Sequence, residues 1–171
     1  MFLVCSFIKK VGVEIKSKED LERNSEKYFV NVNQYEQLKE MDDKLDWDYL
    51  DGAIEMKYYN EEILGFQYWD LVDQCWMYLC DMLEELREKK ETSRFFPDMP
   101  VKISMVKQNP DHIRFSLDSR IWILPMEAFQ QAIISGAVDF YTNLMNCFGK
   151  SHPRYPWWKD DLERIKRKFK G

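Results

Sequence analysis

One stretch constrains the fold more than any other: residues 68–91, YWDLVDQCWMYLCDMLEELREKKE. Apolar side chains recur there at three- and four-residue steps, as Val72, Trp76 and Leu79 illustrate. This period predicts an amphipathic helix of about six turns with a broad apolar stripe. Acidic residues near its start and basic residues near its end suit the helix dipole. Such a helix needs an apolar surface to pack on, and the rest of the chain must supply it.

A second long helix is predicted for residues 125–148, PMEAFQQAIISGAVDFYTNLMNCF. Pro125 suits the first helical position, and Gly149 suits the cap that ends a helix. Residues 149–156, GKSHPRYP, read as a linker to a third helix at 157–170, WWKDDLERIKRKFK. That third helix has a basic face. Basic residues are favourable near any helix C-terminus, and the alternative interpretation is a patch that binds a membrane or nucleic acid.

The remaining segments indicate strands that run in hairpin groups rather than in β-α-β alternation. With 171 residues, the chain is long enough for one domain, 1–171, with a substantial core. We therefore expect an α+β fold: an antiparallel sheet of about five to seven strands packed by two long amphipathic helices, plus the C-terminal helix. The expected strands are 2–15, 28–33, 53–59, 63–67, 100–108, 112–118 and 120–125, with a short helix over 34–45 and a polar loop or single helical turn over 17–27.

Composition and charge exclude several classes of function. Aromatic residues make up 15% of the chain, which indicates a core rather than disorder. The net charge of −5 is the opposite of what a general nucleic-acid binder needs, and it suits a basic protein partner. No apolar run is long enough for a membrane span, so we expect a cytoplasmic protein. The four cysteines form no C-x-x-C pair, and we expect free buried thiols.

The most unusual segment is MDDKLDWDYLDG at residues 41–52. Five aspartates occur there within ten positions, and two aromatic residues lie between them. Like charges this close repel one another unless they are solvated or used by a partner. The candidate site residues are therefore Asp42, Asp43, Asp46, Trp47, Asp48, Tyr49 and Asp51.

Metal and nucleotide chemistry fit this segment poorly. An EF-hand starting at Asp46 would have Leu50 at position 5 and Lys57 at position 12, where acidic residues are required. The Asp46-Trp47-Asp48 triplet matches the D-x-D of sugar-nucleotide transferases, but the chain lacks their nucleotide-binding framework. A looser carboxylate site remains open. We assign no metal and no cofactor.

No motif for nucleophilic catalysis occurs either. The chain has no G-x-S-x-G, no P-loop and no G-x-G-x-x-G, and its six glycines are few for a phosphate-binding loop. Its two histidines, His112 and His152, have no evident zinc or nucleophile partner in the sequence. A carboxylate-dependent, metal-assisted enzyme acting on a small molecule remains the alternative to a non-catalytic protein.

Two interpretations of the acidic segment follow. In one, it is a solvated loop before a hairpin, with Trp47 packed inward. In the other, it is a docking surface for a basic protein, where aromatic residues supply contact area and carboxylates speed association.

The run LDWDYLDGAIEMKYYNEEILGFQYWDLVDQCWMYLCDMLEEL, with FFPDMPVKI and the later AFQQAIISGAVDFY, resembles small bacterial proteins of the polymorphic-toxin immunity type. The resemblance lies in pattern, acidity and size over residues 28–148. It implies a bacterial protein that binds one toxin domain and blocks its active site. A protein that self-associates through exposed aromatic residues such as Trp157 is a third hypothesis, and the chain is expected to be a monomer or homodimer.

Overall fold

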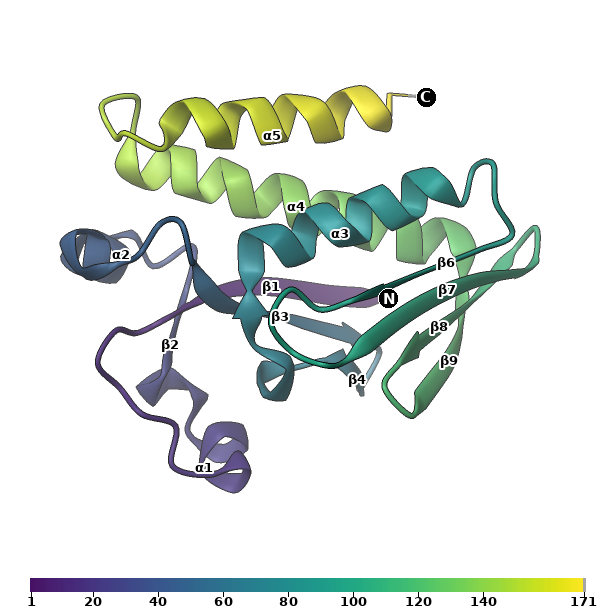
Figure 1. Cartoon of the computed structure of the whole chain (residues 1–171), viewed down its shortest axis with the longest axis horizontal. Coiled ribbons are helices and arrows are strands. Elements are labelled where there is room, and N and C mark those ends of the chain that lie inside the picture. The colour runs from purple at the N-terminus through teal and green to yellow at the C-terminus, as the bar shows by residue number, and fades with distance from the viewer. Residues whose placement is uncertain (171) are drawn as a thin grey trace.

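The computed structural model describes residues 1–170, in which two antiparallel sheets lie beneath two layers of helices (Figure 1). The larger sheet has the strand order β2-β1-β3-β4, and β5 pairs with β3. The smaller sheet has the order β6-β7-β8-β9. The strands are β1 (Phe2–Lys9), β2 (Phe29–Asn31), β3 (Asp51–Tyr58), β4 (Glu61–Leu64), β5 (Asp70–Leu71), β6 (Glu91–Phe95), β7 (Lys102–Asn109), β8 (His112–Leu117) and β9 (Arg120–Pro125).

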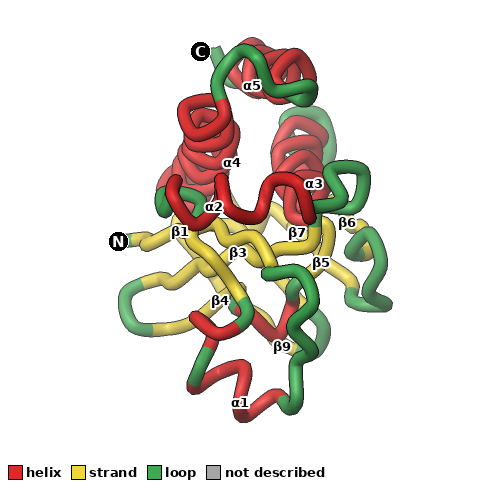
Figure 2. Tube along the Cα trace, turned by 90° about the vertical axis from the view of Figure 1, so that its left-hand side faces the viewer, coloured by secondary structure: helices red, strands yellow, loops and turns green. Residues whose placement is uncertain are grey.

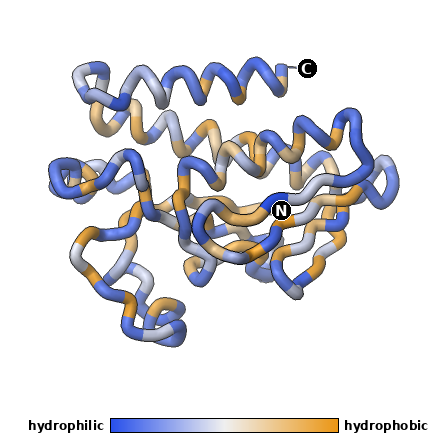
Figure 3. Tube along the Cα trace, in the orientation of Figure 1, coloured by the Kyte–Doolittle hydropathy of each residue, from blue (hydrophilic) through white to orange (hydrophobic). Residues whose placement is uncertain are grey.

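Three long helices form two further layers. Helices α3 (Val72–Glu85) and α4 (Met126–Phe148) lie side by side over the sheets, and α5 (Tyr155–Lys168) lies on the outer side of both (Figures 1 and 2). The short helices are α1 (Lys18–Arg23) and α2 (Tyr35–Met41), with 3-10 turns at Ser25–Lys27, Asp42–Lys44 and Phe66–Tyr68. Apolar residues concentrate in the strands, α3 and α4, whereas α5 is largely hydrophilic (Figure 3).

The core forms because the apolar stripes of α3 and α4 meet the apolar faces of both sheets. In β8, Ile113, Phe115 and Leu117 alternate inward and are fully buried. Phe129 of α4 joins the two sheets, since its ring lies 5.9 Å from that of Phe2 in β1 and 5.1 Å from that of Phe115. One continuous core therefore extends across both sheets and the three long helices.

Trp76 of α3 is completely buried at the centre of this core. Its indole N–H donates to Ser6 Oγ of β1 at 3.0 Å, which satisfies the one polar group of the ring. Gly136 of α4 lies directly against the far edge of the Trp76 ring and beside Val4. The absence of a side chain at Gly136 lets α4 approach α3 and β1 closely.

The fold class is confirmed as α+β with antiparallel strands, two long helices and a C-terminal helix, but the expectation of one sheet was wrong. Strands β4 and β9 connect the two sheets: the Arg120 guanidinium donates to the Glu62 backbone carbonyl at 2.6 Å, and the Trp122 indole N–H donates to Glu61 Oε1 at 2.6 Å. Strand β6 was not predicted, because Thr92 is its only buried residue and the pattern of ETSRF is nearly all polar.

The helix predicted for 68–91 is shorter, and its ends have identifiable causes. It begins at Val72 because Asp70 lies in β5, where its buried carboxylate accepts the backbone N–H groups of Asp98 and Met99 at 2.9–3.1 Å. It ends at Glu85, and the chain then turns into β6. The predicted linker 149–156 is also shorter, since α5 begins at Tyr155 with Pro156 in its first turn.

We predict that Gly136→Ala destabilises the protein by about 1–3 kcal/mol, because the added methyl group would overlap Trp76 and Val4. Replacing a glycine inside a helix with alanine normally stabilises a protein, since alanine is the better helix former. Urea denaturation measures the change. The neighbouring Ser135→Ala is the control, with an expected change within about 0.5 kcal/mol. A stabilising Gly136→Ala would contradict the close packing.

Candidate functional site

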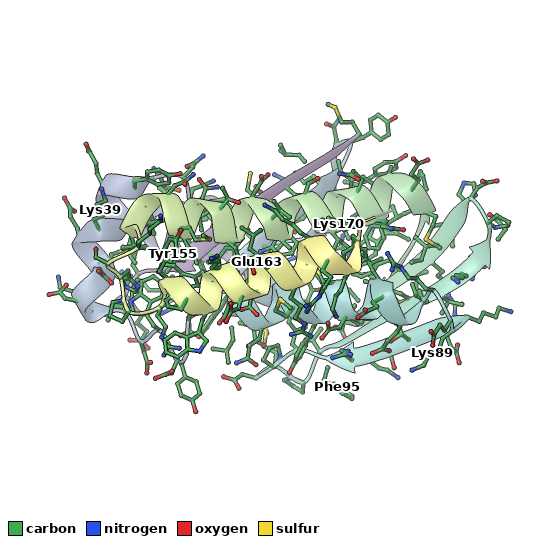
Figure 4. All side chains as sticks on the ribbon, turned by 90° about the horizontal axis from the view of Figure 1, so that it is seen from above. Lys39, Lys89, Phe95, Tyr155, Glu163 and Lys170 are labelled. Atoms are coloured by element: carbon green, nitrogen blue, oxygen red, sulfur yellow. The ribbon has the colours of Figure 1, made fainter. Side chains whose placement is uncertain are left out.

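The acidic segment lies between α2 and β3, against the loop that joins α4 to α5 (Figure 1). It starts with the 3-10 turn Asp42–Lys44, and a second turn is closed by the Tyr49 N–H, which donates to the Asp46 carbonyl at 3.1 Å. This end of the molecule is seen from above in Figure 4, where Lys39 of α2 and Tyr155 of α5 are labelled.

Trp47 anchors the segment to the helices. Its ring packs edge-on against Phe148, His152 and Trp158, with ring centroids 5.0–5.2 Å apart. Its indole N–H donates to Asp42 Oδ1 at 3.0 Å. The interpretation in which Trp47 packs inward therefore describes this residue correctly.

His152 completes the anchor and fixes Asp42. The backbone N–H of Arg154 donates to His152 Nδ1 at 3.1 Å, so the neutral ring carries its proton on Nε2. That Nε2–H donates to Asp42 Oδ1 at 3.0 Å. The imidazole also stacks on Trp158, with centroids 4.7 Å apart and planes 15° apart. Asp42 is therefore bound by the chain's own indole and imidazole.

Arg154 forms the second link between the segment and the helices. Its guanidinium makes an ion pair with Asp48 and lies over the Trp157 ring at 4.7 Å. Asp46 Oδ1 accepts the Asp48 N–H at 3.0 Å, which fixes the turn that presents Asp48. Because Asp48 is largely exposed, the ion pair adds little stability, but it gives the surface a defined shape.

The groups that remain exposed form one neighbourhood. An open, shallow hollow of about 790 Å³ is lined by Asp43, Asp46 and Asp48 from the segment and by His152 and Arg154 from the loop, and Lys39 and Lys44 also line it. Tyr49 follows Asp48 and is 64% exposed, and Trp157 is 56% exposed. We call Asp43, Asp46, Asp48, Tyr49 and Trp157 the acidic–aromatic surface.

Asp51 does not belong to this surface. It begins β3, and burial raises the pKa of its carboxyl, while Lys9 lowers that pKa and the charges of Asp70, Asp98 and Asp46 raise it further. Of the seven candidate residues, the structure thus brings Asp43, Asp46, Asp48 and Tyr49 together outward, uses Asp42 and Trp47 internally, and separates Asp51. Arg154 was missed by sequence reasoning because its partner Asp48 is 106 residues away along the chain.

The described residues hold no cluster of three or more histidine, cysteine or acidic side chains arranged to bind a metal ion. All four cysteines are free, as predicted, and Cys75, Cys80 and Cys147 are buried whereas Cys5 is half-buried. Burial raises the pKa of the Cys80 thiol to about 12 and that of Cys75 well above its usual value. These two thiols stay protonated at neutral pH and are poor nucleophiles.

A separate group of titratable side chains lies between the three long helices. Asp73 Oδ1 is buried without a hydrogen-bond partner among residues 1–170, and burial raises the pKa of Asp73 to about 6. Burial likewise raises the pKa of Asp161 on α5, and the Tyr141 hydroxyl donates to the Asp73 carbonyl at 3.3 Å. This group lies in the packing between the long helices.

Comparisons of the chain with protein-family models, with curated proteins and with solved structures give no match. None of the helices within residues 1–170 has the length and the apolar run needed to cross a membrane.

We predict that Trp47→Ala destabilises the protein by about 2–4 kcal/mol, because it leaves a cavity among three aromatic rings and removes a donor to Asp42. Denaturant unfolding measures the change. Tyr49→Ala is the matched control: its ring is mostly exposed, and we expect a change within about 0.5 kcal/mol. Equal effects of the two substitutions would contradict the anchoring role.

A second prediction concerns pH. Since the pKa of Asp73 is raised in the folded state, the folded protein binds that proton more tightly than the unfolded chain does. The contribution of Asp73 to stability is therefore fully present below about pH 4, and it is lost as pH rises through about 6. Asp73→Asn is expected to stabilise the protein at pH 7 by about 1–2 kcal/mol and to flatten its stability profile between those values.

Unfolding free energies measured between about pH 4 and pH 7 test this prediction for Asp73. The exposed Asp160→Asn on α5 is the control and should leave the profile unchanged. A destabilised Asp73→Asn at pH 7 would contradict the assignment of a carboxylate whose Oδ1 is buried without a hydrogen-bond partner.

Proposed function

We propose that this chain is a non-catalytic protein-binding module of the immunity type, which neutralises a basic bacterial toxin domain through its acidic–aromatic surface. One observation carries the proposal: exposed carboxylates and exposed aromatic rings lie together on a base that the chain itself holds rigid. Trp47, His152 and Asp42 supply that base.

The composition of the surface supports a protein partner. Aromatic residues and arginine are enriched at the centres of interfaces, because they bury large areas at little cost in conformational entropy. Trp157 is held beneath the Arg154 guanidinium, and Arg154 is in turn held by Asp48. A partner would therefore meet side chains that are already ordered, which lowers the entropic cost of binding.

The charge supports a basic partner. Asp43 and Asp46 are exposed and form no ion pair with any residue of the described chain within 4.0 Å. Together with the net charge of −5, their field attracts a cationic protein and speeds its association. If the partner is a nuclease, these carboxylates stand where its substrate's phosphates would bind.

The alternative, a carboxylate-dependent and metal-assisted enzyme, needs converging carboxylates in an enclosed site. Here Asp43, Asp46 and Asp48 line an open hollow, the described residues hold no metal-binding group of three acidic, histidine or cysteine side chains, and Asp42 is already bonded to Trp47 and His152. A partner-binding role therefore accounts for the geometry better than hydrolysis does.

Affinity capture with the immobilised chain from a lysate of the source organism tests the proposal. We predict that a basic protein is retained at low salt and released at high salt, since exposed charges are screened. Asp43→Lys combined with Asp46→Asn should weaken its binding at least about tenfold. The asparagine substituted for Asp46 keeps the side-chain oxygen that accepts the Asp48 N–H, so the turn is preserved.

The control is Asp111→Lys combined with Glu88→Gln, which changes the net charge equally at exposed positions elsewhere. This control should bind as the unmodified chain does. Equal loss in both variants would leave only a non-specific charge effect and would reject the assigned surface. Rescue of growth on co-expression with the captured protein would test the neutralising role.

A further inference from the structure

The first half of β1 has an unpaired edge. Strand β1 pairs with β3 from Phe2 to Ile8, but on its other side β2 pairs only with Phe7, Ile8 and Lys9. None of the other described strands pairs with the first residues of β1 on that side. The edge of the larger sheet is therefore open from Phe2 to Cys5.

The direction of the backbone groups on this edge follows from the ladder. The Tyr59 N–H donates to the Met1 carbonyl, so odd-numbered residues of β1 bond toward β3. The N–H of Val32 donates to Ser6 and that of Lys10 to Tyr28, so even-numbered residues bond toward the opposite side. The N–H and C=O groups of Phe2 and Val4 consequently point out of the open edge.

A groove of about 530 Å³ runs along this edge, and α4 forms its other wall. The helix contributes mainly small side chains there, among them Ala128, Ala132, Ser135 and Gly136. The α4 wall therefore leaves room for another strand beside β1. Figure 4 shows the end of β1 emerging from beneath α4.

Nothing in the open edge itself opposes pairing. Natural edge strands are protected by proline, charged side chains or bulges, and residues 2–5, FLVC, contain none of these. Leu3 points away from the helices and is 57% exposed. An unprotected apolar edge of this kind is expected to be covered by another strand.

We propose that β1 of a second copy of this chain covers the edge, so that the two larger sheets join into one across a two-fold axis at Leu3. In this antiparallel arrangement Phe2 lies opposite Val4 of the second copy, and Val4 lies opposite Phe2. Both pairs consist of outward-pointing residues, so four backbone hydrogen bonds form and every free group of Phe2 and Val4 is satisfied.

Alternative registers fit less well. Moving the axis from Leu3 to Val4 would place Phe2 opposite Ser6, whose carbonyl already accepts the Val32 N–H at 3.0 Å. In the proposed register the two Leu3 side chains form a non-hydrogen-bonded pair, in which side chains approach most closely. Their exposed apolar area is then buried.

The charges also allow two copies to meet here. The chain carries a net charge of −5, so most of its surface repels a second copy. Asp139 contributes the only charged side chain in the wall of the groove as the structure describes it. It lies beyond Gly136, which contacts Val4, so the two Asp139 carboxylates fall on opposite sides of the axis. The edge strand itself, residues 2–5, carries no charged side chain on an otherwise acidic protein.

Sedimentation velocity of the full chain across the micromolar to hundred-micromolar range tests the proposal, with an expected dimer of about twice 20.8 kDa. Leu3→Lys would set two lysines directly opposite each other and should weaken dimerisation at least about tenfold. Ile123→Lys is the control, because Ile123 is 54% exposed on edge strand β9 of the other sheet. It should leave the dimer unchanged.

Val4→Pro is the second variant. It removes an N–H that is unpaired within one copy, so the ladder to β3 stays intact, yet it deletes two hydrogen bonds of the dimer. We expect a folded monomer by circular dichroism. In the unmodified dimer, hydrogen exchange should show a protected Val4 amide that loses its protection on dilution.

Three results would overturn the proposal. These are a monomer at every concentration, a dimer that resists both Leu3→Lys and Val4→Pro, and an exposed Val4 amide that is protected only by a captured partner protein. The acidic–aromatic surface is untouched by these variants, so partner binding and dimerisation fail or succeed separately.

Discussion

The burial of α4 on several sides at once determines the arrangement of the whole molecule. Phe129 joins the helix to both sheets, and Gly136 lets it lie directly on Trp76. Farther along, the Tyr35 hydroxyl of α2 donates to Asn143 Oδ1 at 2.8 Å. A close-packed interior transmits the position of one element to its neighbours, so α4 fixes α2 and the loop that leads to α5.

This packing explains how a segment rich in aspartate keeps a defined shape. Five clustered carboxylates would favour an open, solvated loop. Two of them are instead bound by the chain, Asp42 by Trp47 and His152, and Asp48 by Arg154. Those bonds hold the segment against the end of α4 and the start of α5. They therefore also fix the positions of the carboxylates that remain exposed.

Sequence periodicity was sufficient for the elements whose burial is one-sided and regular. The apolar residues of α3 and α4 repeat every three or four positions, and apolar and polar residues alternate along β8. The two helices and this strand were therefore predictable. Strand β6 buries only Thr92, and its pairing with β7 depends on backbone bonds that carry no sequence signal. The division into two sheets, and the start of α3 at Val72 rather than 68, depend on contacts between distant residues such as Asp70 and Met99.

The same limit applied to the candidate site. Composition identified the acidic segment, because clustered aspartates with interleaved aromatic residues are visible in the sequence. Composition cannot tell an inward tryptophan from an outward one, and here Trp47 points inward whereas Tyr49 and Trp157 are exposed. Beside Trp47, Asp42 is held by His152, and Asp48 is held by Arg154, each more than a hundred residues away along the chain. A cluster of aspartates in the sequence thus indicates where an acidic surface lies. The geometry of that surface depends on the cationic and aromatic side chains that the fold places against it.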